Sequence, residues 1–496
     1  MGDFDVAVVG SGVAGLAASL QASDAGAQVI LIEGSDVIGG VSRLSTGIVM
    51  AAGTRYQRAA GIDDSADALF AFYMSTNHWT VEPAVVRALA NESATAVEWL
   101  GDLGVRFYDR IYFSSDEPAP RGHSAIGKGR AIVDTLYGEV RKRKNIEVAL
   151  GRRIDRLLVS GGRVVGAGAG GYEVTAGATV LATGGFGANP KRVDELLPQI
   201  RAHAGDYFWY MGGDTSQGDI FTLVEPLNVQ ILGRNRAQMA IRPDFARIPD
   251  VGLPGWLVLV NGEGRRFFNE MSPSSITQPI VRNQPQPIYA VFDDEAKRAA
   301  QPDPKAASRK VALWGPEVLG GAGRDAGNIP GADWEDWVEP SIDQMHAKGK
   351  VVMAETVAAL ADAIDVPAAN LRGTLDRYNA DTAAHVDSLY LKDPSVMRAV
   401  ATGPFYAVEL RLCQVGVTGA GVRIGPDGAV LDAGTRPVPG LYAAGECTGG
   451  VLGDVYMGFG NSLGNCLSFG RIAGRSAAAT AGARVRSKCP CNDNLI

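Results

Sequence analysis

The chain has 496 residues, of which 46% are apolar, and this length and apolar content predict two or more domains built around a large core. Its formal net charge is -7 and it has no long basic run, which argues against nucleic acid as a partner. No apolar stretch approaches the roughly 18 residues of a membrane span, so we expect no transmembrane segment. The first predicted strand leaves no room for a signal peptide, and the Cys residues are scattered. We therefore expect a cytoplasmic protein without disulfides.

The most informative segment lies at the start of the chain. An apolar run, 6–9, leads into Gly10-Ser-Gly12-Val-Ala-Gly15, and an Ala/Leu-rich run then precedes a second apolar run that ends at Glu33. This order of strand, glycine turn, helix, strand and acid is the dinucleotide-binding fingerprint. Gly10 permits the tight turn, Gly12 lets a pyrophosphate approach the backbone, and Gly15 lets helix and strand pack closely. The helix N-terminus faces the phosphates, and Glu33, roughly 20 residues on, is placed to bind a ribose.

The elements that follow are expected in this order. Helical spacing over 63–103 predicts helices with Ser65 and Thr80 as N-caps. Short alternating strands over 146–180 predict a meander beside the first sheet. The run 256–267 predicts a hairpin around Asn-Gly-Glu-Gly. Further helices are expected over 355–364, 367–384 and 462–477.

These elements predict an α/β fold with a discontinuous Rossmann-type domain. We expect that domain over 1–234 and 413–496, interrupted by an α+β substrate-capping domain over 235–412. The two Cys of the polar tail, Cys489 and Cys491, lack the further ligands that a structural metal needs, so no metal is expected.

Three further motifs resemble those of two-dinucleotide-fold flavoproteins that bind FAD. A Gly-Gly-Val-Ser loop follows the ribose acid, Ala-Thr-Gly-Gly ends an apolar run at 185, and a short strand ends in Gly-Glu at 446. Their order along the chain predicts FAD as the cofactor. The cofactor contacts implied are Gly10, Gly12, Val13, Ala14, Gly15, Glu33, Gly34, Gly39, Gly40, Val41, Ser42, Thr183, Gly184, Gly185, Gly445, Glu446, Asn461, Ser462 and Leu463.

The whole chain resembles the fumarate reductase/3-ketosteroid dehydrogenase flavoprotein family. The matching motifs, in order, are GSGVAG, GGVS, ATGG, VNGEGRRFFNE, VTGAGV, PGLYAAGE and GGVLGDVYMGFGNSLG. The hairpin segment 260–270 is especially specific, and residues 45–60 are similar to the Δ4-(5α) type of ketosteroid dehydrogenase.

The chain departs from the fumarate branch of this family at the substrate. That branch holds a dicarboxylate with Arg and His, because a guanidinium matches a carboxylate bidentately. Here segment 271–275 contains no Arg, segment 417–421 contains no His, Leu452 replaces a His, and Tyr456 falls where another Arg would be. The His used for flavin attachment in succinate dehydrogenases is also absent, so we expect noncovalent FAD and no useful fumarate reduction.

Tyr456 and Gly460 instead resemble the Y-x-G-x-G loop of 3-ketosteroid dehydrogenases. The resemblance implies that the Tyr456 hydroxyl and the Gly460 N–H donate to one ketone oxygen and stabilise the enolate formed when an α-proton leaves. A hydride then passes to flavin N5. We therefore expect an FAD-dependent dehydrogenase, or a reductase in reverse, that forms a C=C bond next to a ketone of a steroid-like hydrophobic substrate and uses an external electron acceptor or donor.

The base that removes the proton is open. The Δ1-dehydrogenase branch has a tyrosine where this chain has Ser274, and Tyr112 or Tyr108 is a candidate for the missing hydroxyl. Tyr207 and Tyr210 are further candidates. For His123 two placements are open: facing the substrate, or on the surface as a loop residue. The alternative function is an FAD-dependent reductase of a small polar enoate, in which Arg43, Arg110 or Arg121 holds the anion.

Overall fold

The principal sheet is built on apolar strands that run parallel to one another. The computed structural model describes residues 3–115, 117–245, 253–272, 274–298, 337 and 339–482. Within them this sheet has eight strands, and its parallel part has the order β18 (Pro437–Ala443), β8 (Tyr172–Leu181), β1 (Phe4–Val9), β2 (Val29–Ile32), β5 (Ile146–Ala149). This arrangement confirms the predicted α/β fold with a Rossmann-type sheet.

The register of these strands brings the glycine motifs together. Val9 of β1 and Ala443 of β18 both lie beside Leu181 of β8. Parallel strands end at a shared edge of a sheet, where ligands of open α/β folds bind. The motifs that follow β1, β8 and β18 therefore meet at one edge, although they are far apart in the sequence.

Antiparallel strands complete the sheet. β17 (Ala429–Leu431) pairs with β18, while β6 (Arg156–Ser160) and β7 (Arg163–Ala169) form a meander that joins β8. The meander predicted over 146–180 is thus present as β6, β7 and the start of β8.

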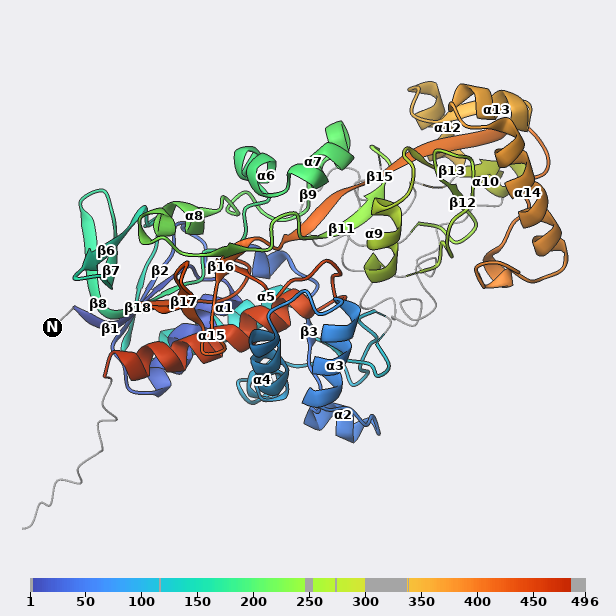
Figure 1. Cartoon of the computed structure of the whole chain (residues 1–496). Helices are drawn as coiled ribbons and strands as arrows, with labels where there is room; N and C mark the ends of the chain where they lie inside the picture. The colour runs from blue at the N-terminus through green and yellow to red at the C-terminus, as the bar shows by residue number, and fades with distance from the viewer. Residues whose placement is uncertain are drawn as a thin grey trace, which may run out of the picture.

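Two helices of small residues pack together beneath the sheet in the view of Figure 1: α1 (Val13–Asp24) and α15 (Asn461–Thr480). A Cβ on Gly470 would lie 2.4 Å from Ala14 O, and one on Gly474 would lie 2.3 Å from Ala18 O. The glycines therefore allow the last helix to approach the first at backbone distance. Farther helices in this part are α2 (Arg55–Ala59), α3 (Ala66–Thr76), α4 (Pro83–Asp102), α5 (Lys128–Lys142), α6 (Pro190–Leu196), α7 (Pro198–Ala204) and α8 (Asp219–Val224).

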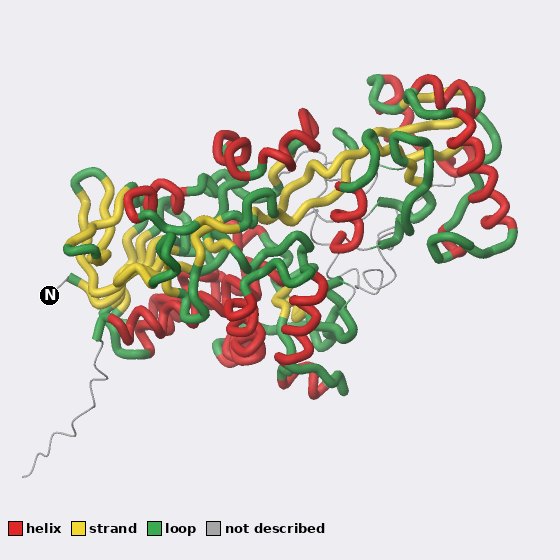
Figure 2. The backbone as a smooth tube through the Cα atoms, viewed as in Figure 1, coloured by secondary structure: helices red, strands yellow, loops and turns green. Residues whose placement is uncertain are grey.

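A second sheet extends away from the first along one long strand, β15 (Phe405–Thr418), as Figure 2 shows. Its order is β11 (Ala237–Arg242), β15, β13 (Ile288–Asp293) and β12 (Val258–Val260), and both β9 (Trp209–Tyr210) and β14 (Val352–Ala354) also pair with β15. The domain boundaries at 235 and 412 stay a prediction. The helices of this part are α9 (Ser274–Arg282), α10 (Asp294–Arg298), α12 (Glu339–Ala347), α13 (Val357–Ala363) and α14 (Ala368–Ala383).

Two smaller sheets are also present. β3 (Ile48–Met50) pairs with β4 (Gly122–Ser124), and β16 (Gly421–Arg423) lies between β10 (Ile231–Leu232) and β19 (Thr448–Gly449).

Two local predictions need correction. The hairpin expected over 256–267 has its turn, but the second arm contributes only the bridge between Val260 and Arg266, because β12 pairs with the distant β13 instead. Ser65 caps α3 through a bond from Ala68 N, as predicted. Thr80 caps no helix: α4 begins after Glu82 with a proline in its first turn, and the Thr80 hydroxyl donates to Asn77 O.

In the part of the chain that the structure describes, no helix combines the length and apolar character needed to cross a bilayer. The same residues contain no cluster of three or more His, Cys, Asp or Glu side chains placed to hold a metal ion. Cys489 and Cys491 lie outside the described residues.

Candidate functional site

The glycine loop between β1 and α1 has the geometry that a phosphate site requires. Gly10 adopts φ of +103°, and a Cβ on it would lie 2.2 Å from Ala182 O. A Cβ on Gly15 would lie 1.8 Å from Gly10 O, so both positions require glycine for packing. Gly12 differs, because a Cβ there would meet only the Ser42 hydroxyl, at 3.4 Å, on the side that faces a cavity.

Gly12 is also the N-cap of α1, and no side chain caps this helix. Val13 N donates to Ser42 Oγ at 3.1 Å. The first turn of α1 holds no acidic residue, so its positive end stays available to an anion.

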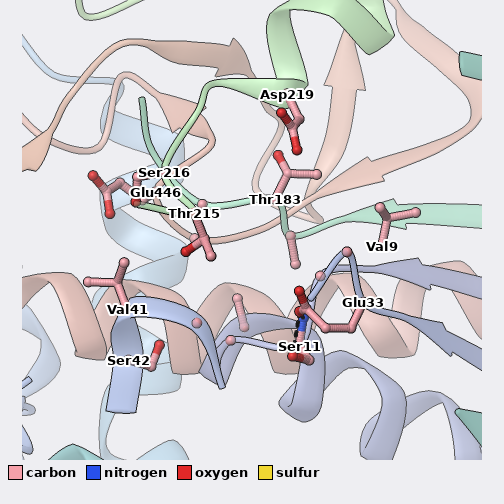
Figure 3. Close-up of a pocket in the computed structure, with 18 of the residues that line it drawn as sticks. Val9, Ser11, Glu33, Val41, Ser42, Thr183, Thr215, Ser216, Asp219 and Glu446 are labelled. Atoms are coloured by element: carbon pink, nitrogen blue, oxygen red, sulfur yellow. Dashed lines mark hydrogen bonds between the residues drawn. The ribbon is translucent and has the colours of Figure 1, made fainter. Parts of the chain in front are cut away.

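Glu33 stands at one end of the cavity, at the tip of β2. Its carboxylate accepts hydrogen bonds from Ser11 N at 2.9 Å, Ser11 Oγ at 2.5 Å and Ser35 N at 2.9 Å. These bonds hold the carboxylate beside the glycine loop, where the sequence places the ribose. Figure 3 shows Glu33 and Ser11 together at this end.

The opposite end of the cavity is formed by Val41, Ser42, Ser216 and Glu446 (Figure 3). Glu446 accepts hydrogen bonds from Thr418 N and Thr418 Oγ1, each at 2.8 Å. Burial raises the pKa of the Glu446 carboxyl above its ordinary value. A Cβ on Gly185 would lie 2.1 Å from Glu446 Oε1, so only a glycine in the Ala-Thr-Gly-Gly motif leaves room for the Glu446 carboxylate.

The cavity between these ends has a volume of about 200 Å³. The predicted contacts that line it are Gly10, Gly12, Val13, Ala14, Glu33, Gly34, Gly40, Val41, Ser42, Thr183, Gly184, Gly445 and Glu446. The predicted contacts outside its lining are Gly15, Gly39, Gly185, Asn461, Ser462 and Leu463.

Sequence reasoning missed other residues of the lining. They are Val9, Ser11, Ser35, Arg152, Arg153, Ile154, Ala182, Thr215, Ser216, Asp219, Ala444 and Cys466. Several neighbour the motifs and could have been included with them. Arg152 to Ile154 follow β5, whose place in the parallel sheet was the one available signal.

The residues present fit a dinucleotide. The uncapped helix end and the bare Gly12 backbone suit a pyrophosphate, and Glu33 suits a ribose diol. Thr183 Oγ1 is buried, lines the cavity and has no hydrogen-bond partner among the described residues. A ligand in the cavity would supply this hydroxyl with the partner that buried polar groups normally have.

Tyr456 lies at the start of α15. Its side chain is half-buried, and its hydroxyl oxygen accepts a hydrogen bond from Ser462 N at 3.3 Å. Gly460 is the N-cap of this helix with φ of +87°, and its carbonyl accepts from Met50 N. The Tyr456 hydroxyl and the N-terminal amides of α15 therefore lie together, with no side-chain cap and no acidic residue in the first turn.

The candidate bases fall in different places. Tyr112 is 2% exposed and its backbone is bridged to Gly122. The Tyr207 hydroxyl donates to Glu409 at 3.5 Å, whereas the Tyr210 hydroxyl donates at 2.9 Å to Ser216 Oγ, a residue of the cavity wall. Burial, followed by the charge of Glu446, raises the pKa of Tyr210.

Two other candidates for the base are Tyr108 and Ser274. Tyr108 donates its backbone N–H to Ser124 O. Ser274 begins α9, and its side chain lies outside the described part.

The surface placement considered for His123 is wrong. His123 is fully buried in β4, with Nε2 2.8 Å from Thr54 Oγ1 and Nδ1 2.9 Å from Arg121 O. Burial lowers the pKa of His123 to about 4, so the ring is neutral at neutral pH.

The arginines considered as anion ligands are differently engaged. Arg121 is buried and donates to both carboxylate oxygens of Asp64, at 2.8 and 2.7 Å. Its remaining Nη1 is buried without a partner among the described residues. Arg43 donates to Ile38 O, and Arg110 is exposed with its guanidinium over the Tyr112 ring.

A second cavity, of about 310 Å³, adjoins the segment that carries Tyr456. The described residues of its wall include neither Arg nor Lys. The lining residues are Phe72, Thr76, His78, Ser115, Ile276, Pro279, Ile280, Val455 and Met457.

Comparison with known proteins places the chain among flavoproteins. The FAD binding domain family matches residues 5–463. Fumarate reductase (cytochrome) of Shewanella frigidimarina is 30% identical over 488 residues, which cover 96% of this chain and 77% of that protein. Urocanate reductase of Eggerthella lenta is 26% identical, with 97% of this chain and 75% of that protein covered.

Among solved structures, 3-ketosteroid-Δ4-(5α)-dehydrogenase from Rhodococcus jostii RHA1, in complex with 4-androstene-3,17-dione, superposes with a TM-score of 0.73 at 26% identity. The match covers 96% of each chain. The expected FAD cofactor is confirmed by these matches.

Proposed function

The chain belongs to the FAD binding domain family and is an FAD-dependent oxidoreductase of C=C and CH–CH groups, and from this premise we propose that its substrate is a steroid-like hydrophobic ketone. In the proposed reaction a C=C bond forms next to the carbonyl, or is reduced in the reverse direction. An external electron acceptor or donor completes the cycle. FAD, held noncovalently, supplies the two-electron chemistry when bound.

The observation that carries this proposal is the position of the Tyr456 hydroxyl at the N-terminal end of α15, where its oxygen accepts a hydrogen bond from Ser462 N at 3.3 Å. A hydroxyl and a backbone amide can donate to one carbonyl oxygen, which gains negative charge as the α-proton leaves. We assign these donor roles to Tyr456 and Gly460.

The α-proton requires an acceptor within hydrogen-bond reach. Tyr112 and Ser274 are our first candidates, and Tyr210 gains support from its bond to a residue of the cavity wall. The α-proton goes to this base, and the β-hydrogen leaves with the electron pair.

We further propose that residues 235–412 cap the substrate. Pairing of β11, β12 and β13 around β15 supports a separate unit, and α9 of this segment lines the apolar cavity beside the Tyr456 loop. The described part of this wall has no Arg or Lys, which suits the apolar body of a hydrophobic substrate better than a dicarboxylate.

The second candidate is a reductase of a small polar enoate. Two sequence relatives, a fumarate reductase and a urocanate reductase, favour it. The engagement of Arg121 by Asp64 opposes it, because the sequence offers that arginine as an anion ligand.

One experiment separates the candidates. The purified holoenzyme is mixed anaerobically with saturated 3-ketosteroids and cyclohexanones while the flavin absorbance is followed, and with reduced methyl viologen plus 4-androstene-3,17-dione, fumarate or urocanate. We expect flavin bleaching by a saturated ketone and viologen oxidation by the enone. Turnover confined to the acids would overturn the proposal in favour of the enoate reductase.

A further inference from the structure

One buried amide holds the chain on both sides of Tyr456. Asn77 directly follows α3 and is fully buried. Its Oδ1 accepts from Val455 N at 3.0 Å, and its Nδ2 donates to Met457 Sδ at 3.1 Å. Nδ2 also donates to Tyr73 O at 3.2 Å, so the amide uses its acceptor and both donor hydrogens.

The two neighbours of Tyr456 are more deeply buried than Tyr456 itself. Val455 and Met457 are 4% and 1% exposed, whereas Tyr456 is half-buried and reaches the start of α15. With the residues on either side held by one side chain, the backbone of Tyr456 has little freedom. The loop also fits closely around the amide, since a Cβ on Gly453 would lie 1.9 Å from Asn77 Oδ1.

The preceding turn of α3 fixes both ends of the same loop. Tyr73 is 1% exposed, and its hydroxyl lies 3.0 Å from Val451 O and 3.2 Å from Asn461 Oδ1. Val451 precedes Tyr456, and Asn461 is the first residue of α15. Thus α3 contacts the loop before Tyr456, beside it and after it.

A left-handed helix end does not explain an asparagine here. Asn77 has φ of −91°, outside the left-handed region where asparagine is favoured. The left-handed conformations fall on the next two residues, His78 and Trp79, with φ of 50° and 60°. The side chain of Asn77 is therefore accounted for by its contacts with the loop.

We propose that Asn77, supported by Tyr73, is a positioning residue that sets the Tyr456 hydroxyl where it meets the substrate carbonyl. This inference rests on the proposed function of Tyr456. Asn77 has no contact with the reacting atoms and acts through the Tyr456 backbone. Misplacement of a donor by about 1 Å can cost roughly 10²-fold in rate.

The test is a double-mutant cycle with Asn77→Leu and Tyr456→Phe. Flavin reduction by 5α-androstane-3,17-dione is followed anaerobically over a range of ketone concentrations. We expect Asn77→Leu to slow the limiting rate by about 10- to 100-fold in the wild-type background and by less than about twofold when Tyr456 is already Phe. The half-saturating ketone concentration should change much less than the limiting rate.

Asn145→Leu is the matched control. Asn145 also accepts one bond, from Ser23 Oγ, and donates two, to Ser23 O and Ala27 O, but it lies beside the end of α1. Its loss should lower stability without an effect that depends on Tyr456. Equal slowing by Asn77→Leu in both backgrounds, or the same pattern for Asn145→Leu, would overturn the proposal.

Amide hydrogen exchange gives a readout that needs no turnover. Val455 N–H loses its acceptor in Asn77→Leu, so peptides that cover 451–461 should exchange faster than in wild type and in Asn145→Leu. Unchanged exchange would show that Asn77 does not hold the loop. If Tyr456→Phe alone leaves the rate unchanged, the proposed function fails, and exchange alone decides whether Asn77 positions this segment.

Discussion

Replacement of Tyr456 by phenylalanine separates a chemical role from a packing role. The change removes one oxygen and keeps the ring. The bond that this oxygen accepts from Ser462 N is long, at 3.3 Å, so its loss should cost no more than about 1 kcal/mol of folding stability. Loss of one donor to a developing oxyanion typically lowers kcat by about 10²–10³-fold, equivalent to roughly 2.7–4 kcal/mol. The expected rate effect is therefore severalfold larger, in free energy, than the stability effect.

The assay is anaerobic flavin reduction by a saturated 3-ketone at saturating concentration, with flavin content and thermal stability measured on the same samples. Ketone binding should weaken less than turnover, because the enolate gains more from the donor than the ground-state ketone does. Tyr442→Phe is the control, since its hydroxyl meets Thr480 Oγ1 at the far end of α15. Equal rates in wild type and Tyr456→Phe would refute the assignment and move the search for the donor to Tyr108, Tyr112 and His123.

Four other outcomes are expected. Gly12→Val should fold, because φ is −61° at this position and a Cβ there would meet only Ser42 Oγ. It should nevertheless lose FAD, because the valine side chain would occupy the space of the pyrophosphate. Normal flavin absorbance of the variant would contradict this. Acid precipitation should release intact FAD, and yellow colour in the pellet would disprove noncovalent binding. Reduced-viologen assays should show no useful fumarate turnover, whereas rates on the order of 10 per second would overturn the branch assignment. Folding lowers the pKa of His123 from 6.5 to about 4, so as pH falls the unfolded chain binds this proton first, and up to about 3 kcal/mol of folding stability is lost between these two values. In urea unfolding, the free energy of unfolding should therefore drop less between pH 7 and pH 5 for His123→Gln than for wild type.

The cofactor half of the molecule was predictable because its signals are local. Each motif combines an apolar strand with glycines whose necessity is visible in the structure, as at Gly10 and Gly15. Parallel pairing of β1, β8 and β18 then brings the motifs to one edge without any further information. The helices α1 and α15 were expected for the same reason, from small-residue runs next to glycine turns.

The remainder depends on pairing between distant segments. β12 pairs with β13, with Val258 beside Val291, instead of with the second arm of the predicted hairpin. No local sequence pattern identifies β13 as the partner of β12. His123 was ambiguous because its burial depends on β3, which packs beside β4. The contact of Asn77 with Val455 joins segments 378 positions apart, and asparagine after a helix has a sufficient local explanation. The sequence alone does not distinguish an asparagine that ends a helix from one that holds a distant loop.

The charge balance around the substrate side favours a neutral ligand. A dicarboxylate needs charge-assisted bonds, each worth about 1.5–3 kcal/mol, to offset the water it gives up. Arg121 Nε and Nη2 could bind an anion only by leaving Asp64, which is as buried as the arginine itself, so a ligand that keeps this ion pair could meet only Nη1. Removal of one partner from a buried ion pair costs about 3–5 kcal/mol, comparable to the whole gain from a new contact. A ketone oxygen needs no cation, because hydroxyl and amide donors of the kind found at Tyr456 and Gly460 suffice. On the proposed function, we therefore expect a neutral ketone to bind at lower cost in free energy than a dicarboxylate, with the donors interacting most strongly with the charge that develops during reaction.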